Sequence, residues 1–504
     1  MAVIELKNID NISQSCDHVK AASVDYHWKT KCQTSFWKKF KYIITHITVE
    51  PIVFLYILAS TMNSLVTQNL SLEKACRVNL HLNESICDAM VLRNRSGYLP
   101  EDEVDVQKMV VQWAAYKAFV IGSVTVVLIV FFGSWSDRHR RRKPLILFPM
   151  YGDLIGSIGL LICSFYLREL SIEYTWLVDT ISLALFGGPC ILFLGIYSYV
   201  GGNSSEEDKT LRIGSVAIAN MVGMSTGMFM SGILLNRLGF LGAYSISATC
   251  LTMAILYGRV MVKEKGVKVE EDVKTGFFQD LFALEHVKNT FKICFQKREC
   301  NRRKRILILM FLSMMVMGSM YGELTVQYMY LRLKCGWNEV DFSIYNALHF
   351  GIQIFGNSFA LSFFSKYLKW DDAILGIIAI ISKSSAYLIY AFAPTGMYFY
   401  IGAVVEIFYA AIFIAMRSIM AKVVPPHELG QSNSIFGICE ALMPFIFGPL
   451  YSKIYIVTMT VFPGTFLLFS LGLYMVAFCL FMCLYKSGRD QSKLQVKEKP
   501  WNMK

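Results

Sequence analysis

Charged side chains are scarce in this chain. Asp, Glu, Lys and Arg make up only 17% of its 504 residues, whereas 55% are hydrophobic and the mean hydropathy is +0.45. This composition excludes an ordinary soluble fold, which would need more polar surface. The sequence also lacks a nucleophile elbow, a phosphate-binding glycine loop and a metal-ligand spacing, and its 13 cysteines form no metal or redox motif. We therefore expect neither an enzyme nor a cofactor-binding protein.

Long apolar runs are abundant. A bilayer core needs about 20 apolar residues per helix, and runs of this length recur between charged or Pro/Gly/Asn-containing stretches. They cover residues 42–65, 112–133, 144–166, 177–200, 212–236, 240–262, 306–331, 341–368, 373–393, 396–421, 431–457 and 461–485. Core helices of a large soluble protein would not repeat so often at membrane length. We predict an all-α membrane protein with twelve transmembrane helices in two six-helix halves, residues 42–262 and 306–485.

Positive charges indicate the orientation, because Lys and Arg accumulate in cytoplasmic loops. They gather in four segments that alternate loops place on one side, namely 1–41, 138–143, 263–305 and 486–504. Residues 1–41 also lack the apolar segment and cleavage site of a secretory signal peptide. We predict that both termini are cytoplasmic. Topology then accounts for the net charge of +12, so we expect membrane lipid around the chain and no nucleic-acid partner.

The turn between the second and third spans combines one acid with many cations. It contains Gly133, Asp137, Arg138, Arg141 and Arg142. A carboxylate is favoured beside cations and at a helix N-terminus. We therefore expect Asp137 to form such a contact when the cytoplasmic side is closed.

Residues 66–111 are predicted to form an outward-facing loop. Three N-glycosylation sequons occur there, at Asn69, Asn83 and Asn94, and Asn83 and Asn94 lie well clear of the helix ends. Cys76 and Cys87 lie in the same loop, and Cys335 lies in a short loop on the same side, where disulfides are permitted. Three cysteines cannot all pair, so one is expected to stay free.

The central segment 263–305 is predicted to be a cytoplasmic linker. Its residues 277–292 have roughly helical apolar spacing and suggest an amphipathic helix on the inner membrane surface. A plain linker between two bundles is the alternative.

Ionisable residues inside the spans are candidates for function, because each costs about 2.5 to 3.5 kcal/mol at a helix centre. They are Glu50, Asp153, Asp179, Glu323, His349, Lys383, Glu406, Arg417 and Glu440. For each, a structural ion pair is the alternative role. A buried carboxylate can bind and release a proton, so Glu406, Glu323 and Glu440 are the candidates for proton coupling.

Arg417 is the candidate ligand for an anionic substrate, since its guanidinium matches a carboxylate or phosphate. It follows Glu406 by about three helical turns, so both side chains are expected on nearly the same face of one helix. Other polar residues that could line a cavity are Gln68, Gln327, Asn346 and Gln353, together with Asn220 and Asn357. Hydrogen bonding between helices is the alternative role for these residues.

The motif from Gly133 to Arg142 and the two-halved layout resemble the major facilitator superfamily. Within it, the chain resembles the proton-coupled folate transporter family, which includes the thymic stromal cotransporter and a lysosomal member. The residues that carry this resemblance are Val49-Glu50-Pro51, Thr67-Gln68, Gln112-Trp113, Cys335-Gly-Trp337 and the segment 416–430. The folate transporter has a proton-coupling Glu shortly after the position of Arg212, where this chain has Ala217, so folate is not assumed as the substrate.

This resemblance implies a secondary active transporter, with the proton as coupling ion and no cofactor. The expected cargo is an anionic organic solute of folate, pterin, muropeptide or nucleotide type. A receptor or scaffold that keeps the transporter fold without turnover is the alternative. The resemblance also implies a disulfide from Cys335 to Cys76 or Cys87 that ties the two halves together. We expect the plasma membrane as the location, with an endosomal or lysosomal membrane as the alternative.

Overall fold

A computed structural model of the chain describes residues 47–139, 141–203, 206–264, 302–360, 370–423 and 429–498. Helices dominate these ranges, and no strand occurs within them. The N-terminal half contains α2 (Glu50–Lys74), its π-helical extension η1 (Ala75–Asn79), α3 (Glu84–Val91), α4 (Pro100–His139), α5 (Lys143–Phe165), α6 (Ile172–Phe186), α7 (Gly188–Asn203) and α8 (Glu206–Met261). The C-terminal half contains α11 (Arg302–Cys335), α12 (Glu339–Ala360), α13 (Asp372–Phe392), α14 (Met397–Val405), α15 (Ala411–Val423), α16 (Leu429–Thr458) and α17 (Thr465–Glu498).

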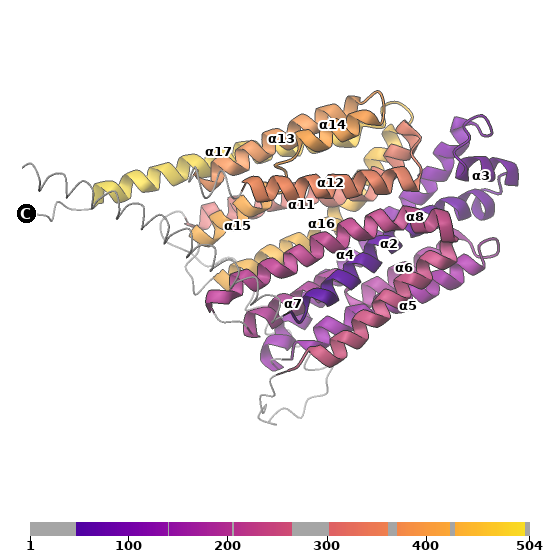
Figure 1. The fold of residues 1–504 in the computed structure, drawn as a ribbon. Coiled ribbons are helices and arrows are strands. Elements are labelled where there is room, and N and C mark those ends of the chain that lie inside the picture. Colours follow the sequence, from indigo (N-terminus) through magenta and orange to yellow (C-terminus); the bar gives the residue numbers. More distant parts are fainter. Residues whose placement is uncertain are drawn as a thin grey trace, which may run out of the picture.

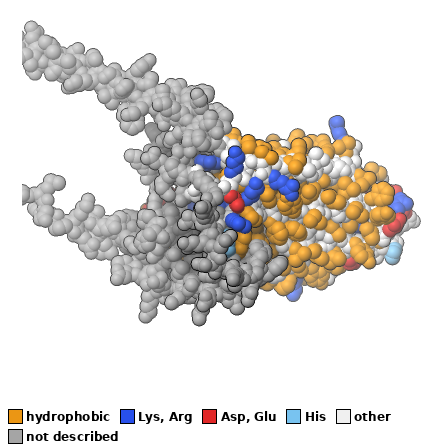
Figure 2. All heavy atoms as spheres, turned by 90° about the horizontal axis from the view of Figure 1, so that it is seen from below, with side chains coloured by type: hydrophobic (Ala, Val, Ile, Leu, Met, Phe, Trp, Pro, Cys, Tyr) orange, Lys and Arg blue, Asp and Glu red, His pale blue; other side chains and the backbone are white. Residues whose placement is uncertain are grey.

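The helices form two neighbouring bundles that follow the predicted halves. Figure 1 shows the indigo to magenta helices on one side of the molecule and the orange to yellow helices on the other. Eight helices of the described ranges are long and apolar enough to cross a membrane. Hydrophobic side chains cover the middle of the surface drawn in colour, as a lipid-facing band requires (Figure 2). The total of twelve spans stays a prediction, and the expected amphipathic segment 277–292 lies outside the described residues.

Several span boundaries differ from the sequence expectation. The second span begins twelve residues earlier than expected, at Pro100, because proline and the acids Glu101, Asp102 and Glu103 suit the first turn of a helix. The fifth and sixth spans are joined directly within α8, where Gly239 alone leaves helical geometry at φ 67° and ψ −172°. The fourth and tenth spans, expected to be continuous, are each divided into two helices, α6 with α7 and α14 with α15.

The two halves meet through small residues, which let helix backbones approach closely in a membrane. On the seam between α4 and α16, a Cβ at Gly122 would lie 2.6 Å from Phe445 Cβ, and one at Gly448 would lie 2.5 Å from Ala118 Cβ. On the seam between α8 and α12, the Gly232 amide donates a 3.0 Å hydrogen bond to Ser343 Oγ. Larger side chains at these glycines would push the halves apart.

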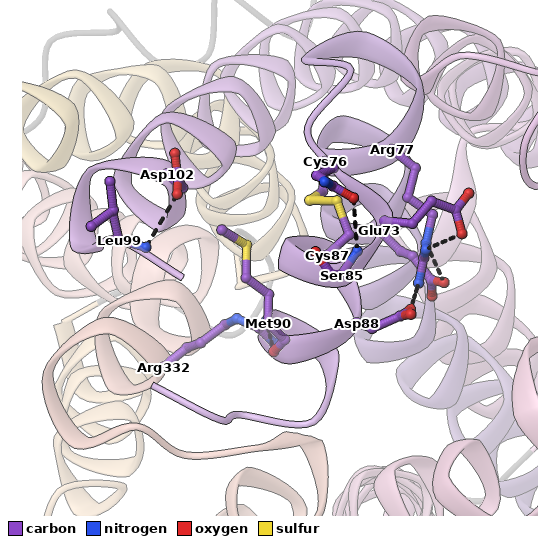
Figure 3. Close-up of a disulfide and its surroundings, with 12 residues drawn as sticks. Glu73, Cys76, Arg77, Ser85, Cys87, Asp88, Met90, Leu99, Asp102 and Arg332 are labelled. Atoms are coloured by element: carbon purple, nitrogen blue, oxygen red, sulfur yellow. Dashed lines mark hydrogen bonds and ion pairs between the residues drawn. A yellow bond between two sulfur atoms is a disulfide. The ribbon is translucent and has the colours of Figure 1, made fainter. Parts of the chain in front are cut away.

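One disulfide lies at the end of the bundle that carries α3, here named the disulfide end. It joins Cys76 to Cys87, because α3 folds back on η1 and brings their Cα atoms within 5.9 Å (Figure 3). Arg77 Nη2 and Asp88 Oδ1, 2.5 Å apart, link the same two elements. Cys335 is free, so the expected bridge from Cys335 to Cys76 or Cys87 is wrong in this structure. The disulfide closes a local hairpin and does not join the two halves.

Charged residues join the two halves at the disulfide end. Glu103 of α4 lies 2.7 Å from Arg93 Nη1 and 3.5 Å from Arg332 Nε of α11, and all three side chains are nearly buried. Arg332 Nη2 donates to Met90 O at 3.1 Å, and Arg93 Nη2 donates to Arg332 O at 2.6 Å. Burial and the charge of Glu103 raise the pKa of Tyr98, whose hydroxyl donates to Glu103 at 3.0 Å. These contacts hold the disulfide end closed.

Asn69 takes part in the same closure. Its Oδ1 accepts a 2.6 Å hydrogen bond from Tyr328 of α11, and its Nδ2 donates to Leu65 O at 3.1 Å. Asn69 is only 8% exposed. A glycan cannot be attached to an amide nitrogen in such a place, so the structure contradicts Asn69 as an acceptor, whereas Asn83 and Asn94 are exposed.

Removing Cys335 should leave the disulfide intact. In the Cys335→Ser variant, non-reducing peptide mapping should still recover the peptide that joins Cys76 to Cys87, because both partners lie in one hairpin. In the unmodified chain, a membrane-impermeant maleimide applied from the disulfide end should label Cys335, which is half-buried. A cross-linked peptide containing Cys335 would contradict the local pairing.

Removing Arg332 should destabilise the closed disulfide end. We expect Arg332→Met to lower the free energy of unfolding by about 3 kcal/mol, because it takes one of two cations from a nearly buried carboxylate. Thermal unfolding of the purified chain in detergent measures the change. The matched control is Lys108→Met, since Lys108 pairs with Asp105 on the exposed surface and such pairs contribute less than about 1 kcal/mol. Equal stability of the two variants would contradict a structural role for Arg332.

Candidate functional site

Four ionisable side chains meet inside the C-terminal half. We name Glu323, His349, Lys383 and Glu406 the C-half cluster. They come from α11, α12, α13 and the break between α14 and α15, respectively. Glu406 is 1% exposed and Lys383 is 5% exposed. Helices distant in sequence thus bring their charges to one buried point.

Glu406 owes its position to the break between α14 and α15. It is the C-cap of α14, with φ −88° and ψ 20°, and the helical hydrogen-bond ladder resumes only at Ala411. Ser382 Oγ of α13 donates a 2.5 Å hydrogen bond to Val405 O, one of the carbonyls that the break leaves unpaired. The broken helix thereby turns the Glu406 carboxylate toward α12 and α13.

Lys383 lies between the two acids of the cluster. Its Nζ is 2.6 Å from Glu406 Oε2 and 3.8 Å from Glu323 Oε2. The ammonium also lies 4.7 Å from the ring centre of Tyr387 and 4.6 Å from that of Tyr409, distances typical of cation–π contacts. Two carboxylates share one lysine, so the cluster with a neutral histidine carries one excess negative charge.

His349 contacts the other oxygen of Glu406. Its Nε2 forms a close contact with Glu406 Oε1, which also accepts a 3.0 Å hydrogen bond from Tyr390. Gln353 Nε2 lies 3.0 Å from the same histidine nitrogen, and the ring of Tyr345 stacks on the imidazole at 5.7 Å. Glu323 Oε1 accepts a 2.5 Å hydrogen bond from Tyr387. An imidazolium here would balance the excess charge.

The structure brings together only some of the sequence candidates. Glu406, Glu323 and Gln353 meet in the C-half cluster. Asn346 lies about two turns before Gln353 on α12, but its amide donates to Phe342 O within the same helix. Gln327 lies one turn after Glu323 on α11 and is half-buried.

Arg417 does not share a helix face with Glu406. The α14–α15 break separates them, and Arg417 lies exposed on α15. The expectation of one continuous helix is therefore wrong, because the backbone gives up its helical bonds to place Glu406. Gln68 is on α2 in the opposite half, and its Oε1 is buried without a hydrogen-bond partner among the described residues. The Glu440 side chain lies outside the described atoms.

The charged turn joins α4 to α5, as expected, at what we name the Arg142 end. Ser136 Oγ donates to Arg141 O at 3.0 Å, and Arg142 Nη1 donates to Ser136 Oγ at 3.0 Å, so α4 stays helical beyond Gly133 to His139. The side chains of Asp137 and Arg138 lie outside the described atoms, and Gly133 is described only as part of the α4 backbone. The expected contact of Asp137 stays a prediction.

Sequence reasoning missed part of the cluster. His349 and Lys383 were candidates without an assigned role, and the tyrosines were not singled out. One signal was available: Lys383, Tyr387 and Tyr390 recur at spacings of four and three, which places them on one face of a helix. The partners on α11 and α12 had no such signal, because their approach depends on tertiary packing. Among the described residues, no group of His, Cys, Asp and Glu could hold a metal ion.

Known proteins with similar sequences are transporters. The chain is 22% identical over 438 residues to the probable peptidoglycan muropeptide transporter SLC46 of Drosophila melanogaster, covering 86% of this chain and 84% of that protein. It is 26% identical over 474 residues to the lysosomal proton-coupled steroid conjugate and bile acid symporter SLC46A3 of Gallus gallus. This match covers 90% of this chain and 97% of that protein. Solute carrier family 46 member 2 of Canis lupus familiaris is 26% identical over 399 residues, covering 73% and 78%. These relatives confirm the resemblance to the proton-coupled folate transporter family.

Solved structures share the fold. A POT family transporter in complex with a thioalcohol-conjugated peptide has a TM-score of 0.57 at 14% identity, covering 88% of this chain and 96% of that one. The human organic anion transporter MFSD10 has a TM-score of 0.54 at 15% identity, covering 86% and 97%. The family described as Major Facilitator Superfamily matches residues 52–448, which include helices of both halves. The chain therefore belongs to the Major Facilitator Superfamily.

Proposed function

We propose that this chain is a proton-coupled symporter of an anionic organic solute, and that the C-half cluster binds the coupling proton. One observation carries the proposal: two carboxylates, one buried at Glu406 and one partly buried at Glu323, face one ammonium. An unbalanced charge in a membrane interior is costly, and a single added proton removes it. A cluster that gains and loses this proton can favour different states of the transporter.

The proton is proposed to reside on the contact between His349 and Glu406. Glu406 already receives hydrogen bonds from Lys383 and Tyr390, and such donors favour a carboxylate. Histidine changes charge near neutral pH and contacts the same carboxylate. Glu323, held by Tyr387, is the second acid of the cluster, and Glu440 remains a further candidate for proton coupling.

The proposed substrate class follows from two similar proteins, whose names specify muropeptides in one case and steroid conjugates and bile acids in the other. Such compounds combine an acidic group with a bulky organic body. Arg417 is exposed on α15 and offers a planar fork of donors to an acidic group. Gln68 has an unpartnered buried oxygen and supplies an acceptor from the other half, with Gln327, Asn346 and Gln353 as further candidate contacts.

The proposed topology places the Arg142 end in the cytoplasm, together with both termini, and the disulfide end in the extracellular space or an organelle lumen. The lysosomal location named for a similar protein supports an endosomal or lysosomal membrane as well as the plasma membrane. Residues 42–262 and 306–485 form the two proposed halves, joined by the linker 263–305. The halves rock around the substrate, and the proton enters from the more acidic side.

Uptake into proteoliposomes tests the proposal. A labelled muropeptide, a steroid sulfate and a bile acid are offered with an outer pH of about 5.5 or about 7.4, and accumulation at the acidic pH is expected for the transported class. Glu406→Gln should abolish proton-driven accumulation but keep exchange, because Glu323 and Lys383 then balance without a proton. His349→Gln should reduce accumulation about tenfold or more, since the excess charge stays unbalanced.

The matched controls are Glu101→Gln and His81→Gln, which change exposed residues at the disulfide end. Both should keep wild-type accumulation. Binding without uptake at either pH would favour a receptor and overturn the transport proposal. Full pH-driven accumulation by His349→Gln and Glu406→Gln would exclude the C-half cluster as the proton site.

Glycosylation at the disulfide end tests the proposed orientation. Glycosidase treatment should lower the apparent mass of the protein. The double variant Asn83→Gln/Asn94→Gln should show little of that change. Asn69→Gln should leave the change intact, because Asn69 is buried against Tyr328. Gel mobility before and after treatment is the measurement. An undiminished mobility change in the double variant would contradict the proposed placement of the disulfide end in the extracellular space or an organelle lumen.

A further inference from the structure

The N-terminal half contains a buried carboxyl group that the proposed mechanism does not use. Asp153 of α5 is only 6% exposed, and its Oδ1 has no hydrogen-bond partner among the described residues. Tyr56 of α2 lies near the carboxyl group, but its hydroxyl also lacks a partner of good geometry. A charged carboxylate in this position would have lost water with no well-aligned donor at Oδ1, which is costly.

Among the described side chains, the one cation that acts on Asp153 already pairs with another acid. Lys117 of α4 is paired with Asp179 of α6, and its ammonium lies 5.6 Å from the ring centre of Trp176. Both Lys117 and Asp179 interact electrostatically with Asp153. We name Lys117, Asp153 and Asp179 the N-half cluster. It repeats the charge count of the C-half cluster, with two acids and one lysine.

The other helices around α5 supply no positive charge to Asp153 within the described ranges. From α7, the titratable group that interacts with Tyr56 is the Cys190 thiol, which carries no positive charge. From α8, Tyr244 interacts with Asp179, and its hydroxyl shares a 3.0 Å hydrogen bond with Thr67. Within the described ranges, the second acid therefore has no cation of its own.

The interface of α2 and α5 next to Asp153 contains an acceptor that lacks a donor in the described part of the chain. Ser157 follows it by one turn on α5 and accepts a 2.7 Å hydrogen bond from Asn63 Nδ2 of α2. The other amide atom, Asn63 Oδ1, is an acceptor without a partner among the described residues. A protonated carboxyl group carries an O–H donor and no charge, so it fits this interface better than a carboxylate.

We propose that Asp153 is a second proton-binding site of the transporter, located in the half opposite the C-half cluster. The proposal rests on the proposed function in that transport is coupled to protons. Asp153 holds its proton while Lys117 is paired with Asp179. If Lys117 turns from Asp179 to Asp153, it favours the carboxylate, and the proton leaves Asp153 for water.

Lys117 is well placed to sense movement between the halves. The next residue on α4, Ala118, packs against Gly448 of α16, on the seam between the two halves. A rocking motion that shifts this seam also shifts the backbone that carries Lys117. The choice of Lys117 between Asp179 and Asp153 thereby depends on the state of the transporter.

Infrared difference spectroscopy tests this site without any substrate. The full chain in liposomes is titrated between about pH 5 and about pH 8, and protonated carboxyl groups are detected by their carbonyl stretching band. Asp153→Asn should remove one such band from the wild-type spectrum. Asp179→Asn should shift the titration of that band to lower pH, because Lys117 is released to pair with Asp153. Lys117→Met should add a second band, from Asp179.

Glu50→Gln is the matched control, because Glu50 is also buried but accepts hydrogen bonds from Ser215 and from the Thr48 and Val49 amides. It should remove no carboxyl band. A spectrum unchanged by Asp153→Asn would overturn the second site, whatever the transport result. Loss of the band in Asp153→Asn, together with full accumulation by His349→Gln, would keep this site and overturn only the proton role of the C-half cluster.

Discussion

The cost of charge in a hydrocarbon environment is the constraint on which the rest of this structure depends. Each half places two carboxylates near one lysine: Glu323 and Glu406 both pair with Lys383, whereas Lys117 pairs with Asp179 and interacts with Asp153 only at longer range. A transporter that only needed rigid pairs would match acids and bases one to one, as Glu50 and Arg212 do at the Arg142 end. In the proposed mechanism, the unmatched acid makes each half sensitive to one proton, and that sensitivity changes the preferred state.

The remaining packing holds together two halves, each of which contains one cluster. Small residues on the α4–α16 and α8–α12 seams allow close contact without interlocking side chains. The disulfide end is closed by specific polar contacts, among them Arg332 with Met90 O and Tyr455 with Gln107. Hydrogen bonds of this kind can be exchanged for water when the end opens, whereas the Cys76–Cys87 disulfide stays within one half and permits the motion.

Much of the fold could be predicted from the sequence, because span length and the absence of charge are local properties of the chain. The positions of Glu406 and Glu323 as buried acids were predictable for the same reason. Their partners were not: Lys383 meets Glu406 only because α14 ends at Val405, and hydropathy contains no sign of that break. The separation of Arg417 from Glu406 has the same origin. The pairing of Cys76 with Cys87 depends on how α3 folds back on η1, which cysteine spacing alone does not determine.

The two clusters are connected by continuous packing through the seam between the halves. Lys117 precedes Ala118, which packs on Gly448 of α16; one turn further on, Tyr451 packs on Gly322, the neighbour of Glu323 on α11. Packed contacts by themselves do not establish coupling, which requires an element with two arrangements that both sites bias. If the halves rock as proposed, the α4–α16 seam is the element that takes two arrangements. In that proposal, a change that repositions α16 against α4 alters the surroundings of Lys117 and of Glu323 together, and the protonation of one cluster then affects the other without any direct contact between their charges.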